Sequence, residues 1–285
     1  MKDIAETLRI LRVIWPVIAP YQEDVVLVGG TAAHLYGLVD GFVGSGMLRA
    51  LNTVDIDIGV PLPMTNRGGN PLVHLLERAG FHATPRATGS AATRIDLPGL
   101  GSDGADPYIE FLAATDASLA GDDAAQDGLR AHLSPYAWML FVEPIRVQLP
   151  DGLGQIRLPH PLSYAAQKAL IAHTTRPLDK RSKDFADALH VLGGFRSTWH
   201  TLFAQHQVLT RVHPAGSEHL SQALGIWTSQ FGTVGRIAPG AALVGQRLAG
   251  GDRERMPLFR DIAGSVGRDI LDAWRQAAAD TTAPG

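Results

Sequence analysis

Apolar residues at the start of the chain recur at the spacing of a helix. Within residues 2–17 they stand three or four positions apart, at Ile4, Leu8, Leu11 and Ile14. This spacing places them on one stripe of an amphipathic helix. Proline inside a helix removes a hydrogen-bond donor and clashes with the turn before it. We therefore predict a helix over residues 2–17 that is ended by Pro16 and Pro20.

Strand patterns follow. Residues 25–28 are wholly apolar, and residues 54–60 alternate apolar side chains with Asp55, Asp57 and Gly59. Successive side chains of a strand point to opposite faces, so both aspartates are predicted on one face. Similar reasoning gives strands at 93–97, 108–112 and 145–149, a helix at 72–79 that stops at Gly80, and a loop at 38–52.

The pattern becomes helical after about residue 161. From there apolar residues recur every three or four positions, with breaks at glycine and proline. The preceding stretch "LPDGLGQIRLPHP" is rich in both residues, which is typical of a domain boundary. The predicted fold class is therefore α/β in the wider, α+β sense, with an α/β domain over residues 1–160 and a helical domain over residues 161–285.

Composition narrows the chemistry. Hydrophobic residues make up 45% of the chain, enough for sizeable cores, and no run of eighteen apolar residues occurs. The first fifteen residues also lack the pattern of a signal peptide, so we expect a soluble, cytoplasmic protein with no membrane partner. The chain has no cysteine, which leaves carboxylates and histidines as the candidate metal ligands.

Charge is divided unevenly along the chain. Residues 1–150 hold 10 Lys and Arg against 17 Asp and Glu, a net charge of −7, and residues 151–285 hold 15 against 11, a net charge of +4. A metal site that faces a polyphosphate or a nucleic acid produces such a division. Solvated surface charge without a function produces the same count, and is the commoner cause.

The two aspartates of the 54–60 strand are candidate metal ligands. Asp55 and Asp57 project from one face with Cα atoms about 6.5 to 7 Å apart, a separation over which two carboxylates can share a divalent ion. Like charges held this close repel each other unless a cation lies between them. The alternative is an amphipathic edge strand whose polar face is simply solvated.

A second candidate site is the Gly pair in "VLVGGTA". Gly29 and Gly30 follow an apolar strand and precede a helical run, where the lack of side chains lets the backbone approach a phosphate. Thr31 is then expected either to cap the helix or to hydrogen-bond the phosphate. Strand-Gly-Gly-helix turns also occur for packing reasons alone. No nucleophile elbow, phosphate loop of the Gly-Lys-Ser/Thr type or dinucleotide fingerprint follows a strand.

Together, "LVGGTA" and "TVDIDIGV" resemble the nucleotidyltransferase superfamily of the DNA polymerase β type, and within it the AbiEii-like and MenT-like nucleotidyltransferases. The resemblance implies a mixed sheet with flanking helices, one or two Mg²⁺ ions on Asp55 and Asp57, and a third carboxylate from a later strand. Glu110 in "PYIEFL" is the first candidate for that carboxylate, and Asp96 in "TRIDLP" is the second.

The resemblance extends into the stretch that begins "PLSYAAQKAL". It implies that Lys168 contacts the triphosphate of a bound NTP, and that Arg181, Lys183 and Asp184 belong to a basic loop and helix that also serve nucleotide binding. Read from the residues alone, Lys168 lies on an amphipathic helix and is either a point charge that offsets negative charge developing during phosphoryl transfer or a snorkelling surface lysine. Asp184 and Asp187 are equally well ion-pair partners of the basic run beside them.

These observations predict an Mg²⁺-dependent nucleotidyltransferase that moves a nucleoside monophosphate from an NTP to a hydroxyl acceptor. The resemblance allows a tRNA or other RNA as acceptor, as for a toxin of a two-gene system with an antitoxin protein partner, or a small molecule such as an aminoglycoside. Two other functions stay open. One is a catalytically silent member that binds nucleotide or a partner protein, and the other is an RNA-binding module whose affinity falls steeply with salt.

Overall fold

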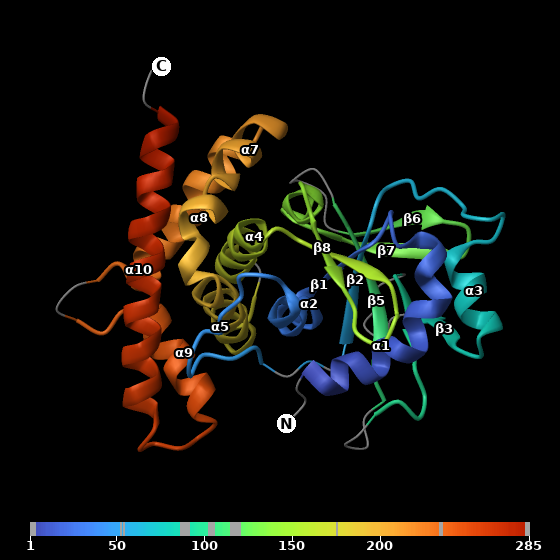
Figure 1. Ribbon diagram of the computed structural model, residues 1–285, viewed down its shortest axis with the longest axis horizontal. Coiled ribbons are helices and arrows are strands. Elements are labelled where there is room, and N and C mark those ends of the chain that lie inside the picture. Colours follow the sequence, from blue (N-terminus) through green and yellow to red (C-terminus); the bar gives the residue numbers. More distant parts are fainter. Residues whose placement is uncertain are drawn as a thin grey trace. The chain divides into compact units, whose positions relative to one another are not determined.

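The protein is described by a computed structural model that covers residues 4–51, 53, 55–85, 92–101, 106–114, 121–174, 176–233 and 236–282. The chain forms two compact units, whose elements are labelled in Figure 1. The first unit comprises Met1–Val39 and Asn52–Pro159, and the second comprises Asp40–Leu51 and His160–Gly285.

A mixed seven-stranded sheet forms the centre of the first unit. Its strands are β1 (Val26–Val28), β2 (Asp55–Val60), β3 (His82–Pro85), β4 (Thr93–Asp96), β5 (Tyr108–Ala114), β6 (Gly121–Gln126) and β7 (Leu129–Ser134). The order is β1-β2-β5-β4-β3, with β7 paired to the end of β5 and β6 paired to β7. Strand β2 runs parallel to β5 and antiparallel to β1. A separate antiparallel hairpin joins β8 (Ile145–Gln148) and β9 (Gln155–Leu158).

In the described part of this unit, the α-helices are α1 (Ile4–Ile18), α2 (Gly29–Leu35) and α3 (Leu72–Arg78). Helix α1 packs against α2 and α3 (Figure 1). The predicted first helix is confirmed from Ile4, since residues 2 and 3 lie outside the described residues. It ends at Ile18, before Pro20, but Pro16 lies inside it and does not end it as predicted. Pro16 lies in the last turn, where few backbone bonds remain to be lost, and the buried side chains of Trp15 and Ile18 anchor that turn in the core.

The predicted mixed α/β fold is confirmed, and so are most of its elements. Strands occur at all five predicted places, 25–28, 54–60, 93–97, 108–112 and 145–149, although the strand that begins at Tyr108 continues to Ala114, and a helix occurs within 72–79. Residue 54 lies outside the described residues. The sequence patterns missed β3, β6, β7 and β9.

The second unit is helical, as predicted. Its α-helices are α4 (Pro161–Thr174), α5 (Leu178–Gly194), α6 (Trp199–Leu202), α7 (Gln205–Val212), α8 (Gly216–Phe231), α9 (Pro239–Ala249) and α10 (Met256–Thr282). Helix α4 packs against α5 and α8, and α9 packs against α10 (Figure 1). Buried aromatic rings in contact with one another, Phe185, Trp227, Phe231 and Trp274 among them, fill the space between these helices. Within the described residues, no helix combines the length and the apolar content that crossing a membrane requires.

Residues 40–51 form no helix or strand, as the loop prediction expected, but they belong to the helical unit. The ring of Phe42 occupies the space that a side chain at Gly194 would fill, and it packs edge-on against Phe195. The backbone N–H of Val43 donates to the Gly194 carbonyl at 2.8 Å. The units therefore differ from the predicted domains, which were divided only once, near residue 160. Residues 40–51 belong to the second unit although they precede that boundary.

His160 immediately precedes α4 and stabilises the first turn of this helix through a side-chain hydrogen bond. Its Nδ1 accepts a hydrogen bond from the backbone N–H of Leu162 at 3.3 Å, which requires an unprotonated nitrogen. Burial lowers the pKa of His160 from 6.5 to about 4. The unfolded chain therefore binds more protons than the folded one between these two pH values, and stability falls as the pH drops through this window.

Replacing His160 with Asn keeps a hydrogen-bond acceptor before α4 and removes the titrating group. We expect the wild type to lose about 1 to 3 kcal/mol between pH 6.5 and 4 through His160, and His160→Asn to lose that much less over the same window. Urea unfolding at a series of pH values measures the difference. Equal pH dependence in both proteins would contradict the role given to His160.

Candidate metal and nucleotide site

Three carboxylates meet on one face of the sheet because of how β2 and β5 pair. These strands are parallel, and Asp57 is the direct partner of Glu110. Side chains of directly paired residues lie on the same face, and Asp55, two positions before Asp57, shares that face. Ile56 and Ile58 point the other way and are buried. The prediction that both aspartates lie on one face of a strand is confirmed.

The three carboxylates are close enough to bind one ion together. One oxygen from each of Asp55, Asp57 and Glu110 lies within 4.8 Å of the others, and all three residues are partly buried. Carboxylate oxygens are hard ligands that suit Mg²⁺, Mn²⁺ or Ca²⁺. The residues present therefore fit a divalent cation, and we refer to them below as the acidic triad.

Neighbouring groups respond to the negative charge of the acidic triad. Burial and then the charges of Asp55, Glu110 and Asp57 raise the pKa of Tyr108 to about 12, although the guanidinium of Arg94, 3.9 Å from the centre of the tyrosine ring, acts in the opposite direction. The hydroxyl of Thr53 donates to the Asp55 carboxylate. The site is thus a region of negative potential that a cation would neutralise.

Asp96, the second candidate for the third carboxylate, is engaged elsewhere. Its carboxylate accepts a hydrogen bond from Arg94 Nε at 2.6 Å and one from the Thr84 hydroxyl at 3.1 Å. Asp96 pairs with Tyr108 across β4 and β5, whereas Glu110 pairs with Arg94 there and with Asp57 across β2 and β5. The carboxylate that joins the two aspartates is therefore Glu110.

The Gly pair lies directly beside the acidic triad. Strand β1 ends at Val28 and α2 begins at Gly29, which has a φ of 63°, in the left-handed region that favours glycine. A Cβ on Gly29 would overlap the Asp57 carboxylate and lie 2.7 Å from its Cγ. The absence of a side chain at Gly29 is therefore what makes room for this carboxylate.

Thr31 connects the same turn to the β2 strand. Its hydroxyl is buried and donates to the backbone carbonyl of Asp55 at 3.1 Å. The expectation that Thr31 caps the helix is wrong, because Val28 occupies the cap position of α2 without a side-chain hydrogen bond. Gly30 is the second residue of α2 and is buried. The contacts made by Gly29 and Thr31 hold the turn against the two aspartates.

Comparing Gly29→Ala with Gly80→Ala distinguishes the cost of crowding the Asp57 carboxylate from the cost of a left-handed backbone conformation. Gly80 is a matched control, because its φ is 92° and nothing lies within 4 Å of a Cβ built there. Both Ala variants should lose about 1 kcal/mol or more from the left-handed backbone. Only Gly29→Ala should lose clearly more than this, since its methyl group displaces the Asp57 carboxylate. Urea unfolding measures both losses, and equal losses in the two variants would contradict this geometry.

In the second unit, Lys168 is buried, so the alternative of a snorkelling surface lysine is wrong. Helix α4 is buried on nearly all sides, and Lys168 and Asp184 are only 6% and 4% exposed. Lys168 Nζ donates to Asp184 Oδ1 at 2.7 Å, and the other carboxylate oxygen of Asp184 lies 3.6 Å from Arg176 Nε. Lys168 and Asp184 thus form a buried ion pair between α4 and α5.

The neighbouring basic residues are also engaged within the helical unit. Lys183 lies 3.1 Å from the fully buried carboxylate of Asp187, which also accepts a hydrogen bond from the Leu51 backbone N–H at 3.0 Å. Arg181 Nε donates to the Arg176 carbonyl at 2.7 Å. The reading of Asp184 and Asp187 as ion-pair partners of the basic run is therefore confirmed. Asp187 also ties residue 51 to α5.

The buried pair makes stability depend on Lys168. Lys168→Met should lower the free energy of unfolding by about 3 to 5 kcal/mol, because it leaves the Asp184 carboxylate buried without its closest cation. Lys180→Met on α5 is the matched control, since Lys180 is exposed. The double variant Lys168→Met/Asp184→Leu should recover part of the loss. Urea unfolding would contradict the pair if Lys168→Met were as stable as Lys180→Met.

Comparison with known proteins decides the family. A family model described as nucleotidyltransferase matches residues 5–209, which include the Gly pair, the acidic triad and the α4–α5 helix pair. The chain belongs to this nucleotidyltransferase family. Neither the curated proteins nor the solved structures yielded a match to the chain. Membership implies transfer of a nucleotidyl group with a nucleotide as substrate, and the acidic triad offers a place for a metal ion.

Proposed function

We propose that the protein is an Mg²⁺-dependent enzyme that transfers a nucleoside monophosphate from an NTP to a hydroxyl group of an RNA. The observation that carries this proposal is the acidic triad, in which Asp55, Asp57 and Glu110 come within 4.8 Å of one another beside the Gly29 turn. Three carboxylates this close are electrostatically costly without a cation. The family match supplies the reaction class.

Each part of the site has a role in this proposal. Asp55, Asp57 and Glu110 hold one or two Mg²⁺ ions, which when bound would neutralise charge on the reacting phosphate and favour ionisation of the acceptor hydroxyl. The turn at Gly29 and Gly30 receives the triphosphate, where the backbone is not screened by side chains. Thr31 keeps that turn in register with Asp55 through its hydrogen bond to the strand.

The helical unit contributes to nucleotide binding through Lys168. Its ammonium group contacts a phosphate of the NTP, and for this contact the nucleotide competes with Asp184. Arg181, Lys183 and Asp184 then support nucleotide binding indirectly, because their contacts hold α4 and α5 in place. Each of them already has a partner within this helical unit.

An RNA acceptor, tRNA in particular, is the choice that the charge of the chain supports. The helical part carries a net charge of +4 over residues 151–285, which favours a polyanion. A toxin-like role with an antitoxin partner is part of this proposal and rests on the resemblance to AbiEii-like proteins. An aminoglycoside is cationic and would prefer acidic surroundings throughout. It is the second candidate because it is a known kind of hydroxyl acceptor in the superfamily that the chain resembles.

The test is transfer from each of the four NTPs, labelled at the α-phosphate, to total tRNA with Mg²⁺ present. Asp55→Asn, Asp57→Asn and Glu110→Gln should each reduce labelling by about a hundredfold or more, since loss of a ligand removes several kcal/mol of metal assistance. Asp96→Asn is the matched control, because Asp96 is a carboxylate on the adjoining strand β4 that pairs with Arg94 instead. It should retain labelling.

Melting temperatures separate loss of metal from loss of fold. Without Mg²⁺, the triad variants should be as stable as the wild type or more stable, because each removes repulsion among the carboxylates. Mg²⁺ should raise the melting temperature of the wild type and of Asp96→Asn but not of the triad variants. A wild type indifferent to Mg²⁺, with triad variants that melt well below it, would refute the metal site.

The acceptor is decided by running a panel of aminoglycosides beside the tRNA. Labelled tRNA and unlabelled aminoglycosides would support the proposal, and the reverse result would replace RNA with a small molecule. NTP binding without transfer to either acceptor would identify a catalytically silent member.

A further inference from the structure

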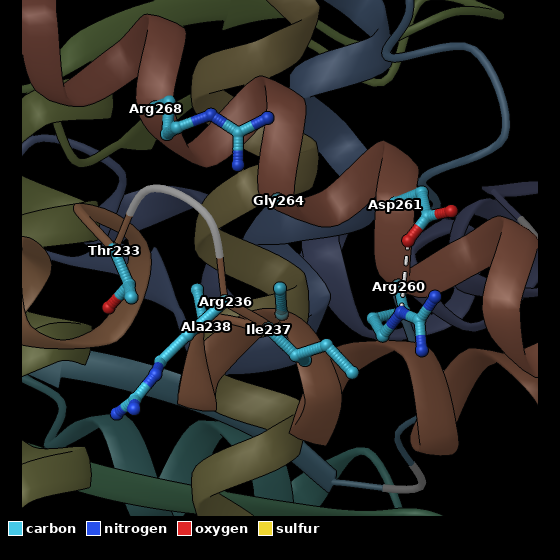
Figure 2. Close-up of a pocket in the computed structure, with 9 residues that line it drawn as sticks. Thr233, Arg236, Ile237, Ala238, Arg260, Asp261, Gly264 and Arg268 are labelled. Carbon is cyan, nitrogen blue, oxygen red and sulfur yellow. Dashed lines mark hydrogen bonds and ion pairs between the residues drawn. The ribbon is translucent and has the colours of Figure 1, made fainter.

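An open hollow lies in the helical unit beside α9 and α10. It has a volume of about 550 Å³ and is lined by Thr233 after α8, residues 236–238 before α9, Ala241 on α9 and one face of α10. Figure 2 shows Arg268 on α10 and Arg236 on the segment before α9 at opposite sides of the hollow, with Arg260 next to Asp261 at one end.

The lining carries an excess of positive charge. The lining includes three arginines and a single carboxylate, and that carboxylate accepts a hydrogen bond from Arg260, whose Nε donates to Asp261 Oδ1 at 2.9 Å. Arg236 and Arg268 are exposed, and neither makes an ion pair with an acidic residue in the described part of the chain. Two guanidinium groups are thus available to an anion, and their planar donors match phosphate oxygens.

Small residues keep the hollow open between Arg260 and Arg268 on α10. Gly264 lies one helical turn from each of these arginines. A Cβ at Gly264 would lie 3.4 Å from Arg268 Nη1 and 3.5 Å from the Ala241 side chain. Ile237, which is 57% exposed, adds an apolar surface at the rim. Along α10 the arginines at 260 and 268 are about 12 Å apart by helical rise.

The openness of the site favours a chain over a small ligand. Pockets for small molecules bury most of their ligand, whereas this hollow has exposed arginines and an exposed isoleucine at its rim. A strand of nucleic acid presents phosphates at intervals with apolar base faces between them, so it can meet cations and an apolar surface at once and continue beyond both ends of the hollow.

We infer that this hollow binds the phosphodiester backbone of a single-stranded segment of RNA, with Arg236 and Arg268 as its phosphate contacts and Ile237 against a base or sugar. The inference deepens the proposed function and rests on it, since it names where the RNA acceptor is held in the helical unit.

The experiment measures RNA binding without NTP and without divalent cations, so that it does not depend on catalysis. Fluorescence anisotropy with a labelled uridine oligonucleotide gives Kd at several salt concentrations for the wild type and for Arg236→Gln/Arg268→Gln. The matched control is Arg211→Gln/Arg253→Gln, which removes the same charge from two exposed arginines outside the hollow. Melting temperatures verify that all three proteins are folded.

We expect Kd to rise about tenfold or more in Arg236→Gln/Arg268→Gln and to change less than about threefold in the control. The slope of log Kd against log salt should fall by about 1.4, or about 0.7 for each lost contact to a single strand. Equal losses in both double variants would overturn the inference, because only general charge would then matter, and so would unchanged binding in Arg236→Gln/Arg268→Gln.

A parallel measurement with inorganic triphosphate and with NTP identifies the source of the phosphate. Weaker binding of these small anions in Arg236→Gln/Arg268→Gln, with RNA binding intact, would overturn the assignment to RNA. If RNA binding depends on the two arginines but the wild type transfers no label to tRNA, the inference about the hollow stands and the proposed function fails.

Discussion

The parallel pairing of β2 with β5 sets the register on which the first unit depends. It places Asp57 beside Glu110 and so brings like charges together at a partly buried position. Neighbouring strands are only about 5 Å apart, and the repulsion between carboxylates at that distance works against the pairing. The apolar side chains on the opposite face, Ile56, Ile58 and Ile109, are buried and stabilise it. Hydrophobic burial on one face thus maintains an unfavourable charge arrangement on the other.

Other features of the first unit follow from this constraint. The Asp57 carboxylate needs space, and Gly29 supplies it by having no side chain. The turn that contains Gly29 needs a fixed position, and the Thr31 hydroxyl supplies it by bonding to the Asp55 carbonyl. A Gly pair, a hydroxyl residue and two aspartates that are separated in sequence are therefore parts of one packing arrangement. That arrangement also explains why both short motifs point to the same chemistry.

Local sequence patterns predicted the helices and strands in which apolar side chains recur at a regular spacing. They failed where an element or a contact depends on residues far away in the sequence. The period of two in 54–60 was enough to put Asp55 and Asp57 on one face. The choice of Glu110 over Asp96 depended on a register between strands about fifty residues apart, which no local pattern contains. Strand β6, with the sequence "GDDAAQ", shows no apolar alternation, because its pairing with β7 and not its composition makes it a strand.

Lys168 shows the same limit for burial. A single lysine in an apolar helix is usually at the surface, and only the position of Asp184, sixteen residues later, explains why this one is buried. The sequence therefore allowed us to predict which residues form the site and on which face of a strand they lie. The partners of those residues were not, because they are fixed by packing between helices and by the register of strands.

The path of residues 40–51 has a consequence for dividing the protein. This segment is flanked on both sides by the sheet unit, yet its Phe42 fills a space on α5 left by Gly194, and its last residue is bound by Asp187. A fragment that begins at residue 161 would contain every helix from α4 to α10 and still lack part of their packing. The chain passes between the two units three times, so neither unit is a continuous piece of sequence. Producing residues 161–285 without the rest of the chain would therefore separate α5 from the aromatic side chain that packs against it.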